Sequence, residues 1–137
     1  MDDATLGYGF SPTNEINFIT PLILSLVDNK TLYLGGEKII KWVGAENRWI
    51  KTNNGNVLDV NAMSAMVASH QDLNTVYAAS SPKATRPNVY KTNNGGDSWV
   101  KITQNLPDRF PAVLAIDPLN DLNIYITFGG FGSSHVF

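Results

Sequence analysis

The amino-acid sequence predicts an all-β fold made of β-propeller blades, about 2.5 to 3 four-stranded antiparallel repeats. Two observations lead to this prediction. A unit of about 44 to 50 residues recurs along the chain, which is the length of a propeller blade. Within each unit, short runs of β-branched and aromatic residues are separated by Asn, Gly and Asp. A β-sandwich also has short strands at regular spacing, but the recurrence of a single pattern favours the propeller.

Each unit begins with a run of apolar and small residues. The three runs are 21–28, 62–68 and 111–117. Near-continuous apolar character is typical of a strand that is buried on both faces of its sheet. We therefore expect each run to be the first strand of a blade, with a neighbouring blade on either side.

A second and a third strand follow in every unit. The second strands are predicted at 31–34, 75–78 and 123–126, and their tyrosines Tyr33, Tyr77 and Tyr125 are 44 and 48 positions apart (77−33 and 125−77). The third strands are predicted at 38–41, 88–91 and 135–137. Turn residues lie between the strands, as in antiparallel hairpins.

A turn-rich stretch from Thr92 to Trp99 follows the third strand of the middle unit. Asn and Gly tolerate the positive φ that tight hairpins need, and an Asn side chain at this position can accept hydrogen bonds from turn N–H groups. A serine can tie the far side of the turn to the backbone, and a tryptophan supplies a large apolar surface. The predicted structural residues of this hairpin are Thr92, Asn94, Gly96, Ser98 and Trp99.

The first unit has a degraded version of this stretch at 42–49, which keeps the final tryptophan and loses the hydroxyls. The predicted divisions are an N-terminal segment at 1–20 that can supply an outer strand, and repeats at 21–60, 61–105 and 106–137. The third repeat stops before its own hairpin. Unpaired strand edges promote pairing with another chain, so we expect self-association through exposed blade edges. Either a longer parent protein or a pair of chains forming six blades would complete such a ring.

Composition excludes several classes of function. The 137 residues carry a net charge of −2 without a cluster of Lys or Arg, so we expect no nucleic-acid binding. The chain has no cysteine, and its two histidines lack the spacing of metal ligands, so neither a metal nor a cofactor is expected. No segment approaches the roughly 20 apolar residues that span a membrane, and no signal peptide is recognisable at the N-terminus.

The span from about Phe18 to Phe137 resembles the Asp-box (bacterial neuraminidase) repeat proteins. The motif Asp97-Ser98-Trp99, the later segment Asn105–Arg109 and the run Tyr125–Gly132 carry this resemblance. It is greatest to secreted bacterial proteins that are sialidase-like or glycosyl-hydrolase-like, in which the chain continues into another Asp-box. The resemblance implies a fragment of an exported protein, extracellular or periplasmic, and it specifies an architecture rather than a reaction.

The sequence offers few candidates for catalysis. Sialidases use an arginine triad, but their Arg-Ile-Pro motif is absent, and Arg109-Phe110-Pro111 resembles it only loosely. Other glycosidases use two carboxylates, for which the candidates are Asp59 and Asp108, on loops before the first strands. Loops carry binding groups in many folds, and the candidate ligand residues there are Arg86, Arg109 and Phe131.

We therefore expect a non-catalytic propeller module that acts as a scaffold or an interaction surface for a carbohydrate or a protein. One alternative is a fragment of a glycoside hydrolase whose active site needs further blades. A second alternative is a protein-binding propeller of the sortilin or assembly-factor type.

Overall fold

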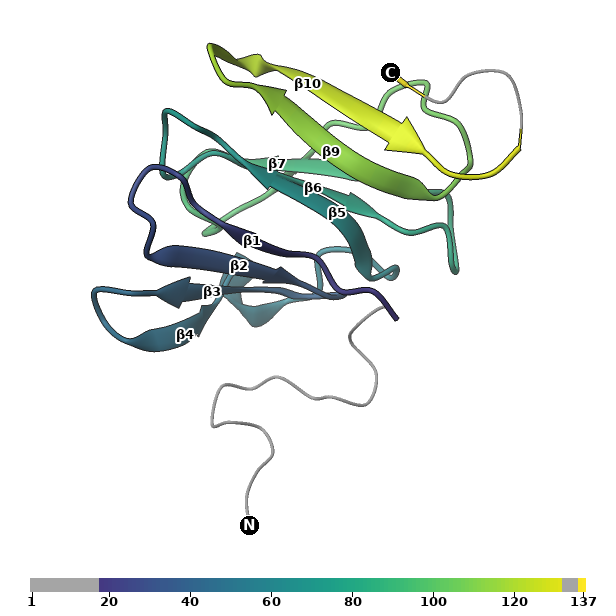
Figure 1. Cartoon of the computed structure of the whole chain (residues 1–137). Helices are drawn as coiled ribbons and strands as arrows, with labels where there is room; N and C mark the ends of the chain where they lie inside the picture. Colours follow the sequence, from purple (N-terminus) through teal and green to yellow (C-terminus); the bar gives the residue numbers. More distant parts are fainter. Residues whose placement is uncertain (1–17, 132–135) are drawn as a thin grey trace.

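The computed structural model describes residues 18–131 and 136–137, and the described residues form three antiparallel sheets (Figure 1). The first sheet contains β1 (Leu22–Leu24), β2 (Thr31–Gly35), β3 (Ile39–Val43) and β4 (Arg48–Lys51). The second contains β5 (Met63–Ala68), β6 (Val76–Ser80), β7 (Val89–Thr92) and β8 (Val100–Lys101). The third contains β9 (Pro111–Asp117) and β10 (Asn120–Phe128). A single 3-10 turn, Asn53–Gly55, lies between β4 and β5.

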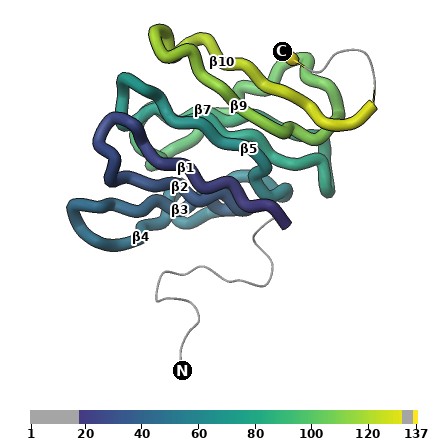
Figure 2. Tube along the Cα trace, in the orientation of Figure 1, coloured from purple at the N-terminus to yellow at the C-terminus, as the bar shows by residue number. Residues whose placement is uncertain are grey.

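The first two sheets are meanders, because their spatial orders β1-β2-β3-β4 and β5-β6-β7-β8 follow the order of the chain. This is the topology of a propeller blade. In the third sheet β10 pairs with β9, and Val136 forms an isolated bridge with Thr127 where a third strand was predicted. Figure 2 shows the sheets as successive layers, from purple and blue through teal to yellow-green. The predicted all-β fold is confirmed.

Several strand boundaries differ from the prediction. The first strand ends at Leu24 rather than at 28, because residues 26–28 form a turn, in which the N–H of Asn29 donates to the carbonyl of Ser25 at 3.1 Å. The last strand of the second sheet, β8, has only two residues, whereas β10 has nine. Most of the N-terminal segment that was predicted to supply an outer strand, residues 1–17, and His135 of the predicted strand 135–137 lie outside the described residues.

The degraded stretch at 42–49 forms a tight hairpin. Trp42 pairs with Trp49 across β3 and β4, and their rings meet edge to face with centroids 5.6 Å apart. Asn47 takes a positive φ of 52°, and Arg48 donates to the carboxylate of Glu46. An aromatic pair, a local ion pair and a left-handed Asn thus occur where the Asn–Gly sequence of the middle repeat is missing.

Two apolar cores lie between the sheets. The core between the first and second sheets contains Tyr33, Ile39, Met63, Met66, Val76 and Ala78. The core between the second and third sheets contains Ala65, Tyr77, Ala79, Val89, Leu114, Ile116, Ile126 and Phe128. Because successive side chains of a strand point to opposite faces, the second sheet contributes alternate residues to the two cores.

The position of a sheet in the stack decides how its strands are buried. In the middle sheet the first strand, β5, has only buried or half-buried residues, as its near-continuous apolar sequence predicts, and every residue of β6 is buried. The prediction of burial on both faces is wrong for β1 and β9, whose residues alternate between buried or half-buried and exposed positions along much of each strand. These strands belong to the end sheets, which have one neighbouring sheet each among the described residues.

The core between the second and third sheets generates a stability prediction. Leu114→Ala is expected to lower the free energy of unfolding by about 2 to 5 kcal/mol, because the leucine side chain is only 5% exposed and its removal leaves a cavity in the core. Urea unfolding followed by circular dichroism measures the loss. The matched control Leu119→Ala, at a turn position that is 85% exposed, is expected to change stability by less than about 0.5 kcal/mol. Equal losses in the two variants would contradict the assigned core.

Candidate functional site: the loop face

Three connections contact one another at one end of the sheets. We call loops 52–62, 81–88 and 102–110 the loop face. In an antiparallel meander, the loop from the second to the third strand and the connection to the next sheet leave the same end of the sheets. Hydrogen bonds join the loops: Asn61 contacts Thr85, and the guanidinium of Arg86 donates to the carbonyl of Leu106 at 2.9 Å. The loop face is therefore a continuous surface.

Asp59 lies at the centre of a buried polar network and is 7% exposed. One carboxylate oxygen accepts a hydrogen bond from the backbone N–H of Asn61 at 3.0 Å. The other accepts three, from the hydroxyl of Ser80 at 2.9 Å, the amide of Asn88 at 2.9 Å and the phenol of Tyr90 at 2.8 Å. The carboxylate thus fastens the connection between the sheets to β6 and β7.

The network also determines the ionisation of its members. Burial by itself would raise the pKa of the Asp59 carboxyl, but the hydrogen bonds from Asn61, Asn88, Tyr90 and Ser80 outweigh burial, and the pKa lies below its ordinary value. The pKa of the Tyr90 phenol is raised by burial, by its hydrogen bond to Asp59 and by the charge of that carboxylate. Asp59 is therefore an ionised acceptor at neutral pH, and Tyr90 is a neutral donor.

Asn61 fixes the conformation of loop 81–88. Its side chain is fully buried, and its oxygen accepts hydrogen bonds from three successive backbone N–H groups, those of Lys83, Ala84 and Thr85. Its amide nitrogen donates to the carbonyl and the hydroxyl of Thr85. Sequence reasoning missed Asn61. The available signal was a polar residue immediately before the apolar first strand of the repeat.

The other candidate residues lie at the surface of the loop face or close to it. Asp108 is exposed on loop 102–110, and Arg109 beside it is half-buried. Arg86 is exposed on loop 81–88, where it bridges to Leu106. Phe131 follows β10 and is fully exposed. Asp59 and Asp108 are thus in different environments, one buried within a hydrogen-bond network and one facing solvent.

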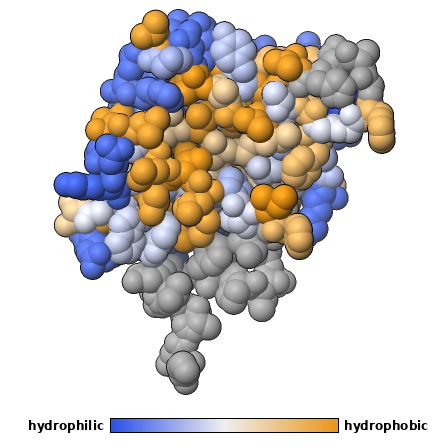
Figure 3. All heavy atoms as spheres, viewed as in Figure 1, coloured by the Kyte–Doolittle hydropathy of each residue, from blue (hydrophilic) through white to orange (hydrophobic). Residues whose placement is uncertain are grey.

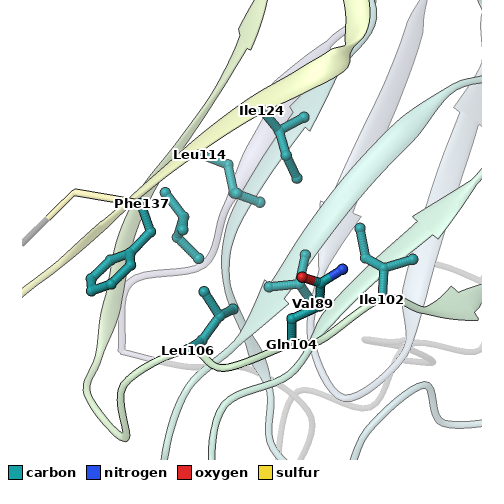
Figure 4. A pocket seen from close by; sticks show the side chains of 8 residues that line it. Val89, Ile102, Gln104, Leu106, Leu114, Ile124 and Phe137 are labelled. Carbon is teal, nitrogen blue, oxygen red and sulfur yellow. The ribbon is translucent and has the colours of Figure 1, made fainter.

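Two hollows flank this region. An apolar cavity of about 260 Å³ lies between the second and third sheets, and Figure 4 shows the side chains that converge on it. It is lined by Val89, Ile102, Gln104, Leu106, Leu114, Ile124, Ile126 and Phe137. A polar groove of about 350 Å³ lies on its loop side, lined by Arg86, Pro87, Asn88, Lys101, Thr103, Gln104, Asn105 and Leu106. The groove combines two cationic groups with amide and hydroxyl groups, which suit a polar ligand.

The hairpin at 92–99 is held by its own side chains. The Asn94 side-chain oxygen accepts from the backbone N–H of Ser98 at 3.0 Å and from the hydroxyl of Thr92 at 2.8 Å. The Asn94 amide donates to the Ser98 hydroxyl at 2.8 Å, and the Thr92 hydroxyl accepts from the N–H of Gly96 at 3.0 Å. These contacts close the turn, as an Asx-turn does.

The same hairpin docks onto the first sheet. The indole N–H of Trp99 donates to the hydroxyl of Thr52 at 3.3 Å, the carbonyl of Gly96 accepts from Asn53 N–H at 2.8 Å, and Lys41 donates to the carbonyl of Gly95. Sequence reasoning missed the partner segment. Its signal is the sequence Lys-Thr-Asn-Asn-Gly, which occurs at 51–55 as well as at 91–95.

The described residues, 18–131 and 136–137, hold no group of three or more His, Cys, Asp or Glu side chains arranged to bind a metal ion. Within the same part of the chain, no helix has the length and apolar character needed to cross a membrane.

Comparison with known proteins bears on the fold. No family model and no curated protein matches this chain. Among solved structures, the crystal structure of a GH74 enzyme from Niastella koreensis is similar, with a TM-score of 0.59 and 20% sequence identity over 77% of this chain. The chain spans 20% of the length of that enzyme. The fold is that of a β-propeller segment.

The Asp59 network predicts a pH-dependent loss of stability. Asp59→Asn is expected to lower the free energy of unfolding by about 1 to 3 kcal/mol at pH 7, because the substituted amide turns a donor toward groups that already donate. The folded-state pKa is lowered, so the stabilisation is present above the unfolded-state pKa of about 3.9 and disappears as the pH falls through the folded-state pKa. Urea unfolding at several pH values should show the variant and the parent converging in acid.

The control for this measurement is Asp108→Asn, which removes an exposed carboxylate from the neighbouring loop. It is expected to leave the unfolding free energy unchanged within about 0.5 kcal/mol at pH 7. A difference between parent and Asp59→Asn that stays constant down to acid pH would show that the ionised carboxylate is not the stabilising species.

The docking of the 92–99 hairpin can be tested with two glycines that have similar positive φ values. Gly96 and Gly130 have φ values of 93° and 101°. A Cβ at Gly96 would lie 2.7 Å from Cγ2 of Thr52, whereas a Cβ at Gly130 meets no heavy atom within 4 Å among the described residues. Gly130→Ala is expected to cost about 1 kcal/mol for the backbone alone. Gly96→Ala is expected to cost about 1 to 3 kcal/mol more, and equal costs in thermal unfolding would contradict the contact.

Proposed function

We propose that this chain is a non-catalytic β-propeller module of the Asp-box type, from a larger exported glycosidase-like bacterial protein, with the loop face as its interaction surface. The environment of Asp59 carries the proposal. Most glycosidases need two carboxylates that reach the same glycosidic bond. Asp59 is buried, and both of its oxygens accept hydrogen bonds from the protein. It therefore holds a loop in place rather than acting on a substrate.

The polar groove supports a carbohydrate as the ligand. Sugar hydroxyls need partners that both donate and accept, and the exposed amide side chains of Gln104 and Asn105 offer such groups along the groove. Arg86 and Lys101 add donors at the same groove. The guanidinium of Arg86 has five N–H groups, of which the contact with Leu106 uses one.

The competing candidate is a glycoside hydrolase fragment. The observation in its favour is the similarity of fold to the GH74 enzyme, of which this chain spans a fifth. In that case Asp108, exposed on the loop face, would be the carboxylate available to a substrate, and its catalytic partner would lie in other blades.

One pair of assays distinguishes the two candidates. The purified chain is incubated with soluble β-glucans and with aryl glycosides, and the released reducing ends and phenols are measured. We expect no release above the blank, because no catalytic pair is assigned on the loop face. In affinity electrophoresis through gels that contain the same polysaccharides, we expect the chain to be retarded. Arg86→Ala is expected to weaken this retardation several-fold through the loss of its donors.

Lys30→Ala is the control for binding, because Lys30 is an exposed cation on the turn between β1 and β2, away from the groove. It should migrate like the parent chain. Hydrolysis above the blank that disappears in Asp108→Asn, with the thermal unfolding unchanged, would support the hydrolase and overturn the proposal. Retardation that survives in both Arg86→Ala and Lys101→Ala would remove the groove from the binding surface.

A further inference from the structure

The outer faces of the first and third sheets are complementary to each other in the same way as the two faces that meet between the second and third sheets. Directly paired residues on neighbouring strands lie on the same face of a sheet. By this rule one face of the first sheet carries Leu22 opposite Leu34 and Leu24 opposite Leu32, and we call it the leucine face. One face of the third sheet carries Tyr125 opposite Ala115 and Thr127 opposite Val113, and we call it the tyrosine face.

Both faces point away from the other two sheets. Ile23 and Tyr33, which alternate with the leucines, belong to or contact the core with the second sheet, and Ile116 and Ile126 belong to the other core. Accordingly Leu22 is 58% and Leu24 is 42% exposed, while Val113 is 55% and Tyr125 is 50% exposed. In Figure 3 apolar side chains gather across the middle of the view, over β1, β5 and β9.

The interface between the second and third sheets shows what these faces can bind. Strand pairing makes Leu22, Leu24, Leu32 and Leu34 the counterparts of Leu114, Ile116, Ile124 and Ile126. It makes Val113, Ala115, Tyr125 and Thr127 the counterparts of Ala65, Val67, Tyr77 and Ala79. Large branched side chains thus face a tyrosine and small residues in the internal interface, and the two exposed faces repeat this combination.

Polar groups at the margin also match. In the internal interface the phenol of Tyr77 donates to the carbonyl of Asp121 at 2.7 Å, and the hydroxyl of Ser69 donates to the carboxylate of Asp121. The counterparts of Ser69 and Asp121 at the exposed faces are Asp117 and Asn29. The carboxylate therefore lies on the tyrosine face (Asp117) and the possible donor on the leucine face (Asn29), the reverse of the internal interface. The carboxylate of Asp117 can accept a hydrogen bond from the amide of Asn29.

We propose that the tyrosine face of one chain binds the leucine face of a second copy, and that the reciprocal contact closes a pair of chains. The contact repeats the internal interface, with Tyr125 donating to the carbonyl of Asn29 in the second copy. Two chains contribute six sheets to one ring, within the usual range of four to eight blades. The contact does not depend on what the loop face binds. It is proposed for this chain of 137 residues by itself, because in a longer parent protein a neighbouring blade would cover the same face.

Light scattering coupled to size exclusion tests the proposal with the full chain over a range of concentrations. The parent is expected to reach twice the 15.0 kDa mass of one chain. Leu24→Lys and Val113→Asp each place a charge on one face, and each variant alone is expected to elute with the mass of one chain. Val57→Lys, at a 48% exposed apolar position on the loop face, is the matched control and should keep the parent mass.

An equimolar mixture of Leu24→Lys and Val113→Asp is the decisive sample. In a heterologous pair the two substitutions meet in one contact, as opposite charges, and the other contact keeps its native residues. The mixture is therefore expected to recover the mass of two chains. Circular dichroism spectra identical to that of the parent establish that each variant is folded.

Three results would overturn the proposal. The first is a parent that stays a single chain at every concentration. The second is a dimer that survives either single substitution, since this would indicate a contact between two like faces. The third is a mass that continues to rise beyond two chains, because the reciprocal contact would then not close.

Discussion

The structure depends on burial between consecutive sheets. A four-stranded meander of this size has two faces, and it becomes stable only when another sheet covers at least one of them. β6 is buried throughout because it has neighbours on both sides, whereas β1 and β9 expose alternate residues. The hydrogen-bonded features are arranged around this packing. The 92–99 hairpin of the second sheet contacts the end of the first sheet. The Asp59 network joins the second sheet to the connection that precedes it.

The acidic residues illustrate how such an architecture uses polar groups. Asp59 is buried and nevertheless ionised, because every partner in its network is a hydrogen-bond donor. Together these hydrogen bonds lower the pKa of the carboxyl by more than burial raises it. Asp28 and Asp72 accept hydrogen bonds from the turns that follow the first strands, and the pKa of each is lowered. Carboxylates in repeat turns thus stabilise turns.

Much of this fold could be predicted from the sequence, because strand period and turn residues are local signals. The tyrosines of the second strands and the Asn-Asn-Gly turn indicated blades, and the structure has strands at those places. Long-range partners were less accessible. That Thr52 receives the indole of Trp99, and that Asn61 holds a loop more than 20 residues further along, follow from sheet stacking. Burial of β1 also depended on the number of sheets beside it, which periodicity does not report.

Asn61 holds the backbone of loop 81–88 through hydrogen bonds that do not involve the side chains of Lys83 and Ala84. Three successive backbone N–H groups of the loop bind the same buried oxygen, while the side chains of Lys83, Ala84 and Thr85 are exposed. Backbone amides are present in every residue type except proline. Lys83 and Ala84 can therefore be replaced without loss of these bonds, whereas the hydroxyl of Thr85 also binds the amide of Asn61. The loop can thus acquire a new surface chemistry at two positions while Asn61 preserves its path.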